Sequence, residues 1–288
     1  MLFDGGVPVY LLDGERPTAV DAGFACLGPY YVQEAAQVLG GRGLHRLLIT
    51  HSHFDHCGSA SVMRRAYPGM RIMASAQAAG VLERPNAQAL ITSLNEAASL
   101  MMVQGGAPAA YPDPGFGPFA VDRALSAGDE LAVADGITVC VLETPGHTRD
   151  CLSFFVKETG WLFTSEAAGI PDSTGYIFCE CLVDFDTYRD SLARLCGLEV
   201  EKICLGHAGV VVSDARGYLA ESLSGCDRFY TRVSEVLAEN GEDIDASMAV
   251  IRAEEYDTKP FPKQPEPAYL LNLRARIGCV KRKRMNGS

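Results

Sequence analysis

The chain has 288 residues, which is enough for one large domain or for a domain with a substantial appendage. Hydrophobic residues make up 48% of it and charged residues 21%, as is ordinary for a globular protein with a sizeable core. The formal net charge of −11 argues against broad nucleic-acid binding, because phosphate contacts need clustered lysine and arginine.

The first residues, MLFDGGVPVYLLDGE, contain no basic region and no apolar stretch of signal-peptide length, and no run approaches the length of a membrane span. The ten cysteines are scattered and include no CxxC pair, so we expect reduced structural thiols, Cys179 and Cys181 among them. These features predict a cytoplasmic protein. The basic run at 281–284 is expected to be a solvated, frayed end.

Short strands and helices follow one another in a mixed order along the first part of the chain. VPVYLLDG and RPTAVDAG are two short runs, each ended by glycine, and they predict a hairpin. Then we expect a helix over 29–39, a buried strand HRLLIT, a helix from Asp55 to about Tyr67, a strand MRIMAS and a helix over 86–104. A loop rich in proline and glycine follows this last helix.

The middle of the chain predicts several more strands, and its end predicts helices. The strands are expected at 119–122, 130–133, 137–143, 151–156, 161–164 and 202–205, with a helix at 187–196 behind Asp186 as its N-cap. Helical patterns then occupy 214–239, 243–256 and 266–280. We therefore expect a domain over 1–213, with a helical insertion at about 84–118, and a helical extension over 214–288. The mixed order favours sheets stacked between helices over a doubly wound parallel sheet.

Five of the six histidines come directly after an apolar strand, where a rigid scaffold presents functional groups. His51, His53 and His56 follow LLIT, His147 follows ITVCVLETPG, and His207 follows KICLG. An acidic residue, Glu166, holds the same kind of position after WLFTS. Chance would scatter histidines over helices and surface, so the pattern indicates a common site.

The spacing of the first histidines suits a metal site. Side chains alternate along an extended segment, so His51 and His53 point the same way and can bind one metal. The chain then turns into a helix, which swings Asp55 and His56 toward a neighbouring point. One tight turn can thus supply ligands to two adjacent metals, and three other loops would complete the shells with His147, Glu166 and His207.

Imidazole and carboxylate ligands suit zinc first, with iron or manganese as alternatives. Two divalent ions roughly 3.5–4 Å apart would share a bridging water, lower its pKa toward about 7 and stabilise a hydrolytic transition state. Asp55 either accepts a proton during the reaction or acts only as a ligand. Thr148 and Asp150 either orient an imidazole or make local turn hydrogen bonds, and Asp21 is interpreted as a turn residue behind the ligands.

The segments THSHFDH, TPGHT, FTSE and LGHAG, in this order over residues 6–212, resemble the metallo-β-lactamase superfamily. The resemblance implies an α+β fold, an αββα four-layer sandwich, to which this chain adds the C-terminal helical extension. It also implies that His51, His53 and His147 hold one metal. The second metal would be held by Asp55, His56 and His207.

One position departs from the family pattern. The family usually has Gly-Asp at the bridging ligand, where this chain has Ser165-Glu166. Glutamate is one methylene longer, so Glu166 could bridge from a backbone set further back, bind one metal only, or turn away and leave a single-metal site. A solvated glutamate with no ligand role is the remaining alternative.

The layout is loosely similar to that of the quinolone-signal response thioesterase, whose C-terminal extension covers the site and narrows access. We therefore expect a dinuclear metallohydrolase in which the activated water attacks a small thioester or ester. The alternatives are a mononuclear iron persulfide dioxygenase, because TPGHTRDC resembles that branch, and a regulatory protein with a retained metal site. A phosphodiesterase fits the acidic chain less well. The expected partner is a small-molecule substrate, with no nucleic acid and no membrane; a homodimer stays open.

Overall fold

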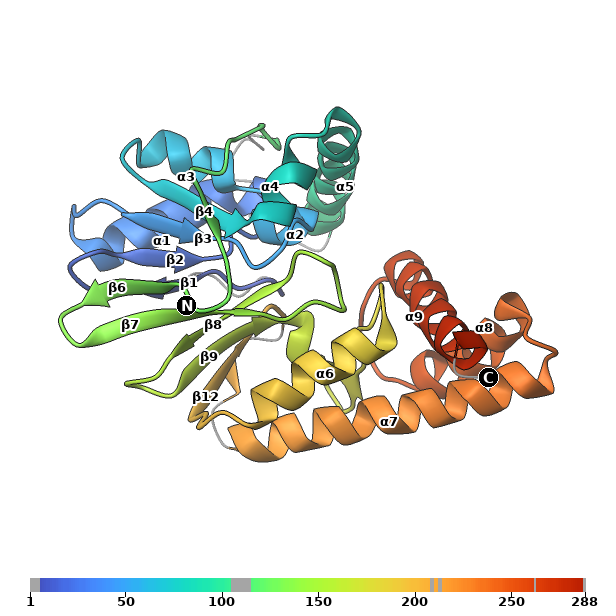
Figure 1. Ribbon diagram of the computed structural model, residues 1–288. Helices are drawn as coiled ribbons and strands as arrows, with labels where there is room; N and C mark the ends of the chain where they lie inside the picture. The colour runs from blue at the N-terminus through green and yellow to red at the C-terminus, as the bar shows by residue number, and fades with distance from the viewer. Residues whose placement is uncertain (1–5, 105–114, 208–209, 212–213, 262, 287–288) are drawn as a thin grey trace. The chain divides into compact units, whose positions relative to one another are not determined.

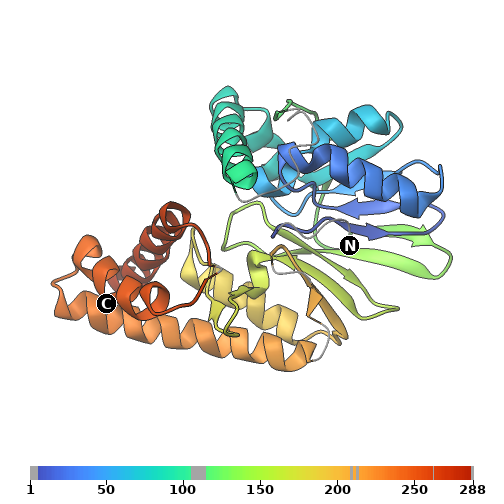
Figure 2. The same ribbon diagram turned by 180° about the vertical axis from the view of Figure 1, so that it is seen from behind.

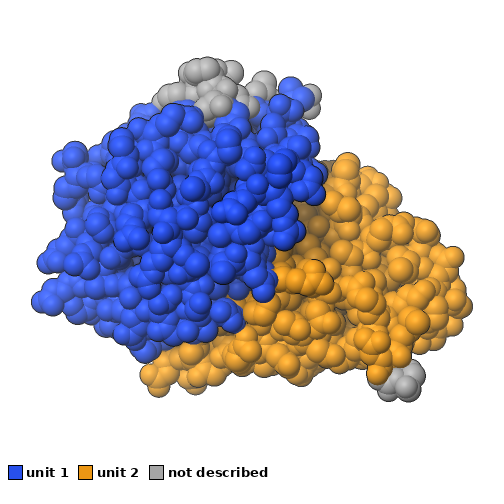
Figure 3. Space-filling model, turned by 45° about the horizontal axis from the view of Figure 1, so that its top comes forward, with its two compact units in different colours: residues 1–143, 150–165, 201–211 blue, residues 144–149, 166–200, 212–288 orange. Residues whose placement is uncertain are grey.

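The computed structural model describes residues 6–104, 115–207, 210–211, 214–261 and 263–286 (Figure 1). The chain forms two compact units, coloured separately in Figure 3. Unit 1 comprises Met1–Glu143, Asp150–Ser165 and Glu201–Val211, and unit 2 comprises Thr144–Arg149, Glu166–Val200 and Val212–Ser288. None of the helices in the described residues combines the length and hydropathy that crossing a membrane requires.

The first sheet of unit 1 has five strands in sequence order. Its strands are β1 (Tyr10–Leu12), β2 (Thr18–Val20), β3 (Arg46–Leu48), β4 (Arg71–Ser75) and β5 (Arg123–Leu125). β1 and β2 form the predicted antiparallel hairpin, and the other pairs are parallel. The connections contain α1 (Gly28–Leu39), α2 (Phe54–Cys57), α3 (Ala60–Ala66), α4 (Ala76–Leu82) and α5 (Pro85–Gln104).

The second sheet has six strands in the order β13-β12-β9-β8-β7-β6. Their bounds are β6 (Glu130–Ala134), β7 (Ile137–Glu143), β8 (Leu152–Val156), β9 (Trp161–Ser165), β12 (Lys202–Leu205) and β13 (Val210–Val211). All neighbours are antiparallel except β9 and β12, which run parallel. Both β9 and β12 therefore end at the same edge, and there they lead into the segments of Glu166 and His207.

Side-chain alternation along the first sheet builds two cores. Leu48 and Met73 join a cluster with residues of the second sheet such as Phe154, whereas their neighbours Leu47 and Ile72 pack against the helices. All four are at most 2% exposed. Each such side chain contributes roughly 1.5–3 kcal/mol by burial. Unit 1 is thus three layers, with helices on one face of the first sheet and the second sheet on its other face (Figure 2).

Unit 2 is mainly helical. It contains a 3-10 turn (Glu166–Ala168), the short pair β10 (Ile170–Pro171) and β11 (Ile177–Phe178), and the helices α6 (Phe185–Cys196), α7 (Ala215–Glu239), α8 (Ile244–Arg252) and α9 (Glu266–Asn286). A π-helical turn, Ala253–Asp257, continues α8. The long helix α7 packs against α6, α8 and α9. In its interior, fully buried Arg276 of α9 pairs with Glu255 through both terminal nitrogens, at 2.7 and 2.9 Å.

Several sequence predictions need correction. The helix expected from Asp55 to Tyr67 is broken at Gly58-Ser59 into α2 and α3. No strand forms at 119–122; β5 begins at Arg123. The N-cap of α6 is Asp184, whose carboxylate accepts the Thr187 N–H at 2.8 Å, and not Asp186.

The basic run at 281–284 is not frayed either: it belongs to α9, and Lys283 pairs with Asp186. Sequence patterns missed α4, the β10–β11 pair and β13. Residues 105–114 of the expected insertion loop lie outside the described residues. The boundary expected between residues 213 and 214 stays a prediction.

Candidate metal centre

The HxHxDH segment begins three residues after the end of β3 and ends inside α2. His53 is the N-cap of α2, and Asp55 and His56 lie within this single turn. His51 and His56 are fully buried, whereas Asp55 is partly exposed. Buried Asn95 of α5 ties this turn to the insertion helix, because its side-chain amide donates to the Phe54 carbonyl at 3.2 Å.

Asp21 organises the segment from behind. Its carboxylate accepts the Thr50 N–H at 2.8 Å and the Thr50 hydroxyl at 2.9 Å, and its Oδ2 lies 2.8 Å from Nδ1 of His56. Asp21 has a φ of 62°, a left-handed conformation that is unusual for a residue other than glycine. A carboxylate behind an imidazole fixes its tautomer and orientation, so Asp21 leaves Nε2 of His56 to face the centre.

The Nε2 atom of His56 faces a carboxylate and a second imidazole. It lies 3.9 Å from Oδ2 of Asp55, and Nε2 of His207 lies 3.6 Å from the same oxygen. Ligand atoms on a tetrahedral zinc, with bonds of about 2.0–2.1 Å, are separated by roughly 3.4 Å. The three side chains therefore need only a small contraction to share one ion.

Gly206 gives His56 its space. A Cβ at this position would lie 2.8 Å from Cε1 of His56 and 3.0 Å from Cα of Ser165. A residue larger than glycine would displace the imidazole or the end of β9. The close packing of His56 and Ser165 therefore explains why a glycine precedes His207.

Asp150 orients a peptide of the HxH segment. Its Oδ2 accepts the N–H of Ser52 at 2.8 Å, and its main-chain carbonyl accepts the Ser75 hydroxyl at 2.9 Å. Ser52 separates His51 from His53, so this buried carboxylate holds the backbone between two candidate ligands. The main-chain carbonyl of Thr148 closes a local turn, in which it accepts the Gly146 N–H at 2.9 Å.

In unit 2, His147 and Glu166 face each other. Nε2 of His147 lies 3.9 Å from Oε1 of Glu166, and Nδ1 of His147 lies 2.9 Å from the Glu180 carbonyl. The Tyr188 hydroxyl donates to the Glu166 carbonyl at 2.9 Å. Glu166 is only 2% exposed, so the interpretation as a solvated glutamate is wrong.

Ser165 explains part of the departure from the family pattern. It has a φ of 49°, a left-handed conformation that glycine adopts without strain. The glycine that the family usually carries at this position would suit this conformation. In this chain Ser165 adopts the conformation, and the longer acidic side chain of Glu166 follows it.

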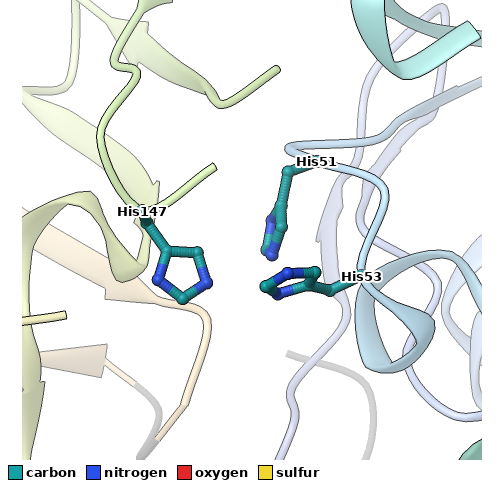
Figure 4. Close-up of side chains that lie close together, drawn as sticks. All are labelled: His51, His53 and His147. Carbon is teal, nitrogen blue, oxygen red and sulfur yellow. The ribbon is translucent and has the colours of Figure 1, made fainter. Parts of the chain in front are cut away.

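Within unit 1, Asp55, His56 and His207 offer ligand atoms that all lie within 4.8 Å of one another. His51 and His53 of the same unit extend from the segment before α2 (Figure 4). In unit 2, His147 and Glu166 are the other two of the seven metal-ligand candidates from the sequence. The donors are imidazole and carboxylate, as expected.

Glu180, in the segment between β11 and α6, is a buried acid. Burial raises the pKa of Glu180 to about 7. The positive charge of Arg276 opposes this rise, and the negative charge of Glu166 adds to it. Its side chain accepts a hydrogen bond from Asn272 of α9 at 3.3 Å. No spacing rule could have found this pair, because the two residues are 92 positions apart.

The family model of the metallo-beta-lactamase superfamily matches residues 2–207, and the chain belongs to this superfamily. An uncharacterized protein of Bacillus subtilis (strain 168), YobT, is 27% identical over 164 residues, which cover 56% of this chain and 61% of that protein. The match therefore spans less than two thirds of this relative's length.

Solved structures agree with the fold. A metallo-beta-lactamase family protein of Thermus thermophilus, TTHA1429, has a TM-score of 0.65 at 21% identity, covering 98% of this chain and 89% of that one. A beta-lactamase domain protein of Burkholderia ambifaria has a TM-score of 0.66 at 17% identity, covering 98% and 82%. At these identities the likeness concerns the fold alone, and it confirms the α+β architecture expected from the sequence.

Proposed function

We propose that the chain is a dinuclear metal-dependent hydrolase acting on a small thioester or ester. The observation that carries the proposal is the convergence of Asp55, His56 and His207, whose facing atoms are 3.6 and 3.9 Å apart. His51 and His53 would be the first two ligands of a second metal ion. Superfamily membership supports the same chemistry, since metal-dependent hydrolysis is common in it.

The donor set fits two divalent ions, with zinc as the first choice. His51, His53 and His147 would hold one ion, and Asp55, His56 and His207 the other, with Glu166 as the candidate shared ligand. When bound, the ions supply Lewis acidity and a water molecule that is deprotonated near neutral pH.

The protein's own contribution is orientation and proton handling. Asp21 and the Glu180 carbonyl fix the imidazoles of His56 and His147 through their Nδ1 atoms. Asp150 holds the peptide between His51 and His53. The carboxylate of Asp55, which is partly exposed, would take a proton during the reaction in addition to its role as a ligand.

A panel of short acyl thioesters and aryl esters, with a phosphodiester as comparison, tests the proposal. We expect thioester or ester cleavage by the zinc-loaded wild type, and a loss of about 10²-fold or more in Asp55→Asn and His53→Ala. Arg274→Ala, on the surface of α9, is the matched control and should retain activity. Cleavage of the phosphodiester alone, or equal rates in wild type and His53→Ala, would contradict the proposal.

A second candidate is a mononuclear iron dioxygenase acting on a persulfide. The pairing of His147 with Glu166 in unit 2 favours it, because histidines together with a carboxylate are the ligand set of many open iron sites. Oxygen uptake separates the candidates. Consumption of oxygen with a persulfide by the iron-loaded protein, without thioester cleavage by the zinc-loaded form, would favour the dioxygenase.

A further inference from the structure

The His147 imidazole receives its orientation from a segment of unit 2 that connects β11 to α6. Nδ1 of His147 lies 2.9 Å from the main-chain oxygen of Glu180. A carbonyl oxygen can only accept a hydrogen bond, so the imidazole must carry its proton on Nδ1. Nε2 then keeps its lone pair, and this is the nitrogen that faces Glu166 at 3.9 Å.

Asn272 of α9 contacts the Glu180 side chain, to whose carboxylate its amide donates at 3.3 Å. The charge of Arg276, one helical turn later, opposes the rise that burial causes in the Glu180 pKa. Arg276 cannot move freely, because Glu255 holds both terminal nitrogens and its guanidinium lies 4.3 Å from the Phe229 ring. This face of α9 is therefore a rigid support for Glu180.

The same segment is also attached next to His147 itself. The N–H of Val183 donates to the Gly146 carbonyl at 3.0 Å. Glu180 is thus fixed at three points: its carbonyl at His147, its carboxylate at α9, and its following residues at Gly146. A displacement of its side chain would rotate or shift the carbonyl that receives the imidazole proton.

We propose that Glu180 and Asn272 are positioning residues, through which helix α9 holds His147 in the tautomer that offers Nε2 as a metal ligand. The ligand role of His147 rests on the proposed function, but its tautomer does not. The C-terminal helices are then part of the centre's support and do more than flank it. A carboxylate buried at 2% exposure has a purpose in this arrangement, because it ties the carbonyl's segment to α9.

The test uses the metal-free full-length protein labelled with ¹⁵N on histidine. Long-range ¹H–¹⁵N spectra distinguish the two imidazole tautomers, and we expect wild-type His147 to be protonated on Nδ1. Asn272→Ala should raise the population of the other tautomer or of ring-flipped forms, and Asn272→Asp should raise it further because two carboxylates would face each other. Leu271→Ala is the matched control, since Leu271 is 70% exposed on the same helix and should leave the spectrum unchanged.

Zinc competition with a chelator gives the second readout. We expect Asn272→Ala and Glu180→Ala to weaken the ion bound through His147 by about 10-fold or more, within the range seen for residues that orient ligands. Glu180→Gln keeps a side-chain oxygen that can accept the Asn272 amide, so it should weaken zinc binding less than Glu180→Ala does.

An Nδ1-protonated His147 in every variant, with unchanged zinc affinity, would overturn the positioning role. A wild-type His147 protonated on Nε2 would overturn it as well. A shifted tautomer without any thioesterase activity would instead leave the positioning role standing and reject the proposed reaction.

Discussion

The single residues around the candidate centre divide into those that face it and those that hold the facing groups in place. Asp21 contacts Nδ1 of His56, the Glu180 carbonyl contacts Nδ1 of His147, and Asp150 accepts the N–H of Ser52, between His51 and His53. Each contact fixes a ligand from the side away from the centre. Such contacts reduce the freedom that metal binding would otherwise have to remove.

The Asp150 carboxylate gives a prediction at this scale. Asp150→Ala should leave the buried Ser52 N–H without its acceptor, which costs about 1–3 kcal/mol of unfolding free energy, and should weaken metal binding about 10-fold. Asp150→Asn retains an oxygen acceptor of the same shape and should restore much of both losses. Urea unfolding and metal titration measure the two effects. Equal behaviour of the alanine and asparagine variants would show that the hydrogen bond to Ser52 is not what matters.

At the scale of the elements, the strand ends are what bring the ligands together. β3, β9 and β12 each end where a candidate ligand follows within a few residues, and the parallel pairing of β9 with β12 places two of these ends at one edge. The helix α2 is only one turn long, and this turn directs Asp55 and His56 back toward the strand ends. The centre therefore depends on loops anchored on rigid strands.

The loop before His147 gives a prediction about an element contact within unit 2. Gly146 has a φ of 133°, and a Cβ on it would lie 2.3 Å from Cα of Tyr188 in α6. Gly146→Ala must therefore push α6 away from this loop. We expect the unfolding free energy to fall by about 3 kcal/mol or more and the metal ion at His147 to bind less tightly. Gly197→Ala, at the other end of α6, meets only one atom at 3.4 Å and serves as the control. A Gly146→Ala protein of wild-type stability would contradict the close packing.

Several elements could be predicted from the sequence because their signals are local. Helical periodicity predicted α1, α5 and the helices α7 to α9, and short apolar runs predicted β7 and β8. The break at Gly58-Ser59 was not predictable, since the hydrophobic pattern continues through it, and a Cβ on Gly58 would lie 2.6 Å from the Gly23 carbonyl, 35 positions away. The short strands β10 and β13 carry too few residues for a pattern.

The candidate ligands were visible in the sequence for a different reason. Histidine is rare in the chain, so five of six behind apolar strands formed a pattern that needed no tertiary information. The supports of those ligands could not be found in this way. Asn272, Arg276 and Glu180 are ordinary polar residues whose meaning comes from contacts across about 90 positions of the chain.

For the molecule as a whole, the buried ion pair of unit 2 joins the C-terminal helix to the π-helical turn. Arg276 and Glu255 have side chains exposed by only 1% and 5%, and Tyr176 and Tyr269 donate their hydroxyls to Glu255. Removing one partner leaves a buried, uncompensated charge, so Arg276→Ala should lower the unfolding free energy by about 3–5 kcal/mol. Arg274→Ala breaks an exposed pair with Asp245 on the same helix and should cost about 0–1 kcal/mol. Denaturant unfolding measures both losses. Similar losses in the two variants would contradict the claim that the buried pair stabilises the protein more than the exposed pair does.

The number of metal ions per chain tests the dinuclear centre most directly. We expect elemental analysis of the purified wild type to give about two divalent ions per chain. His207→Ala should reduce this to about one, while Glu166→Asp should keep two and Glu166→Ala should lose one. One ion per chain in the wild type, unchanged in Glu166→Ala, would contradict both the two-metal centre and the role of Glu166 in it.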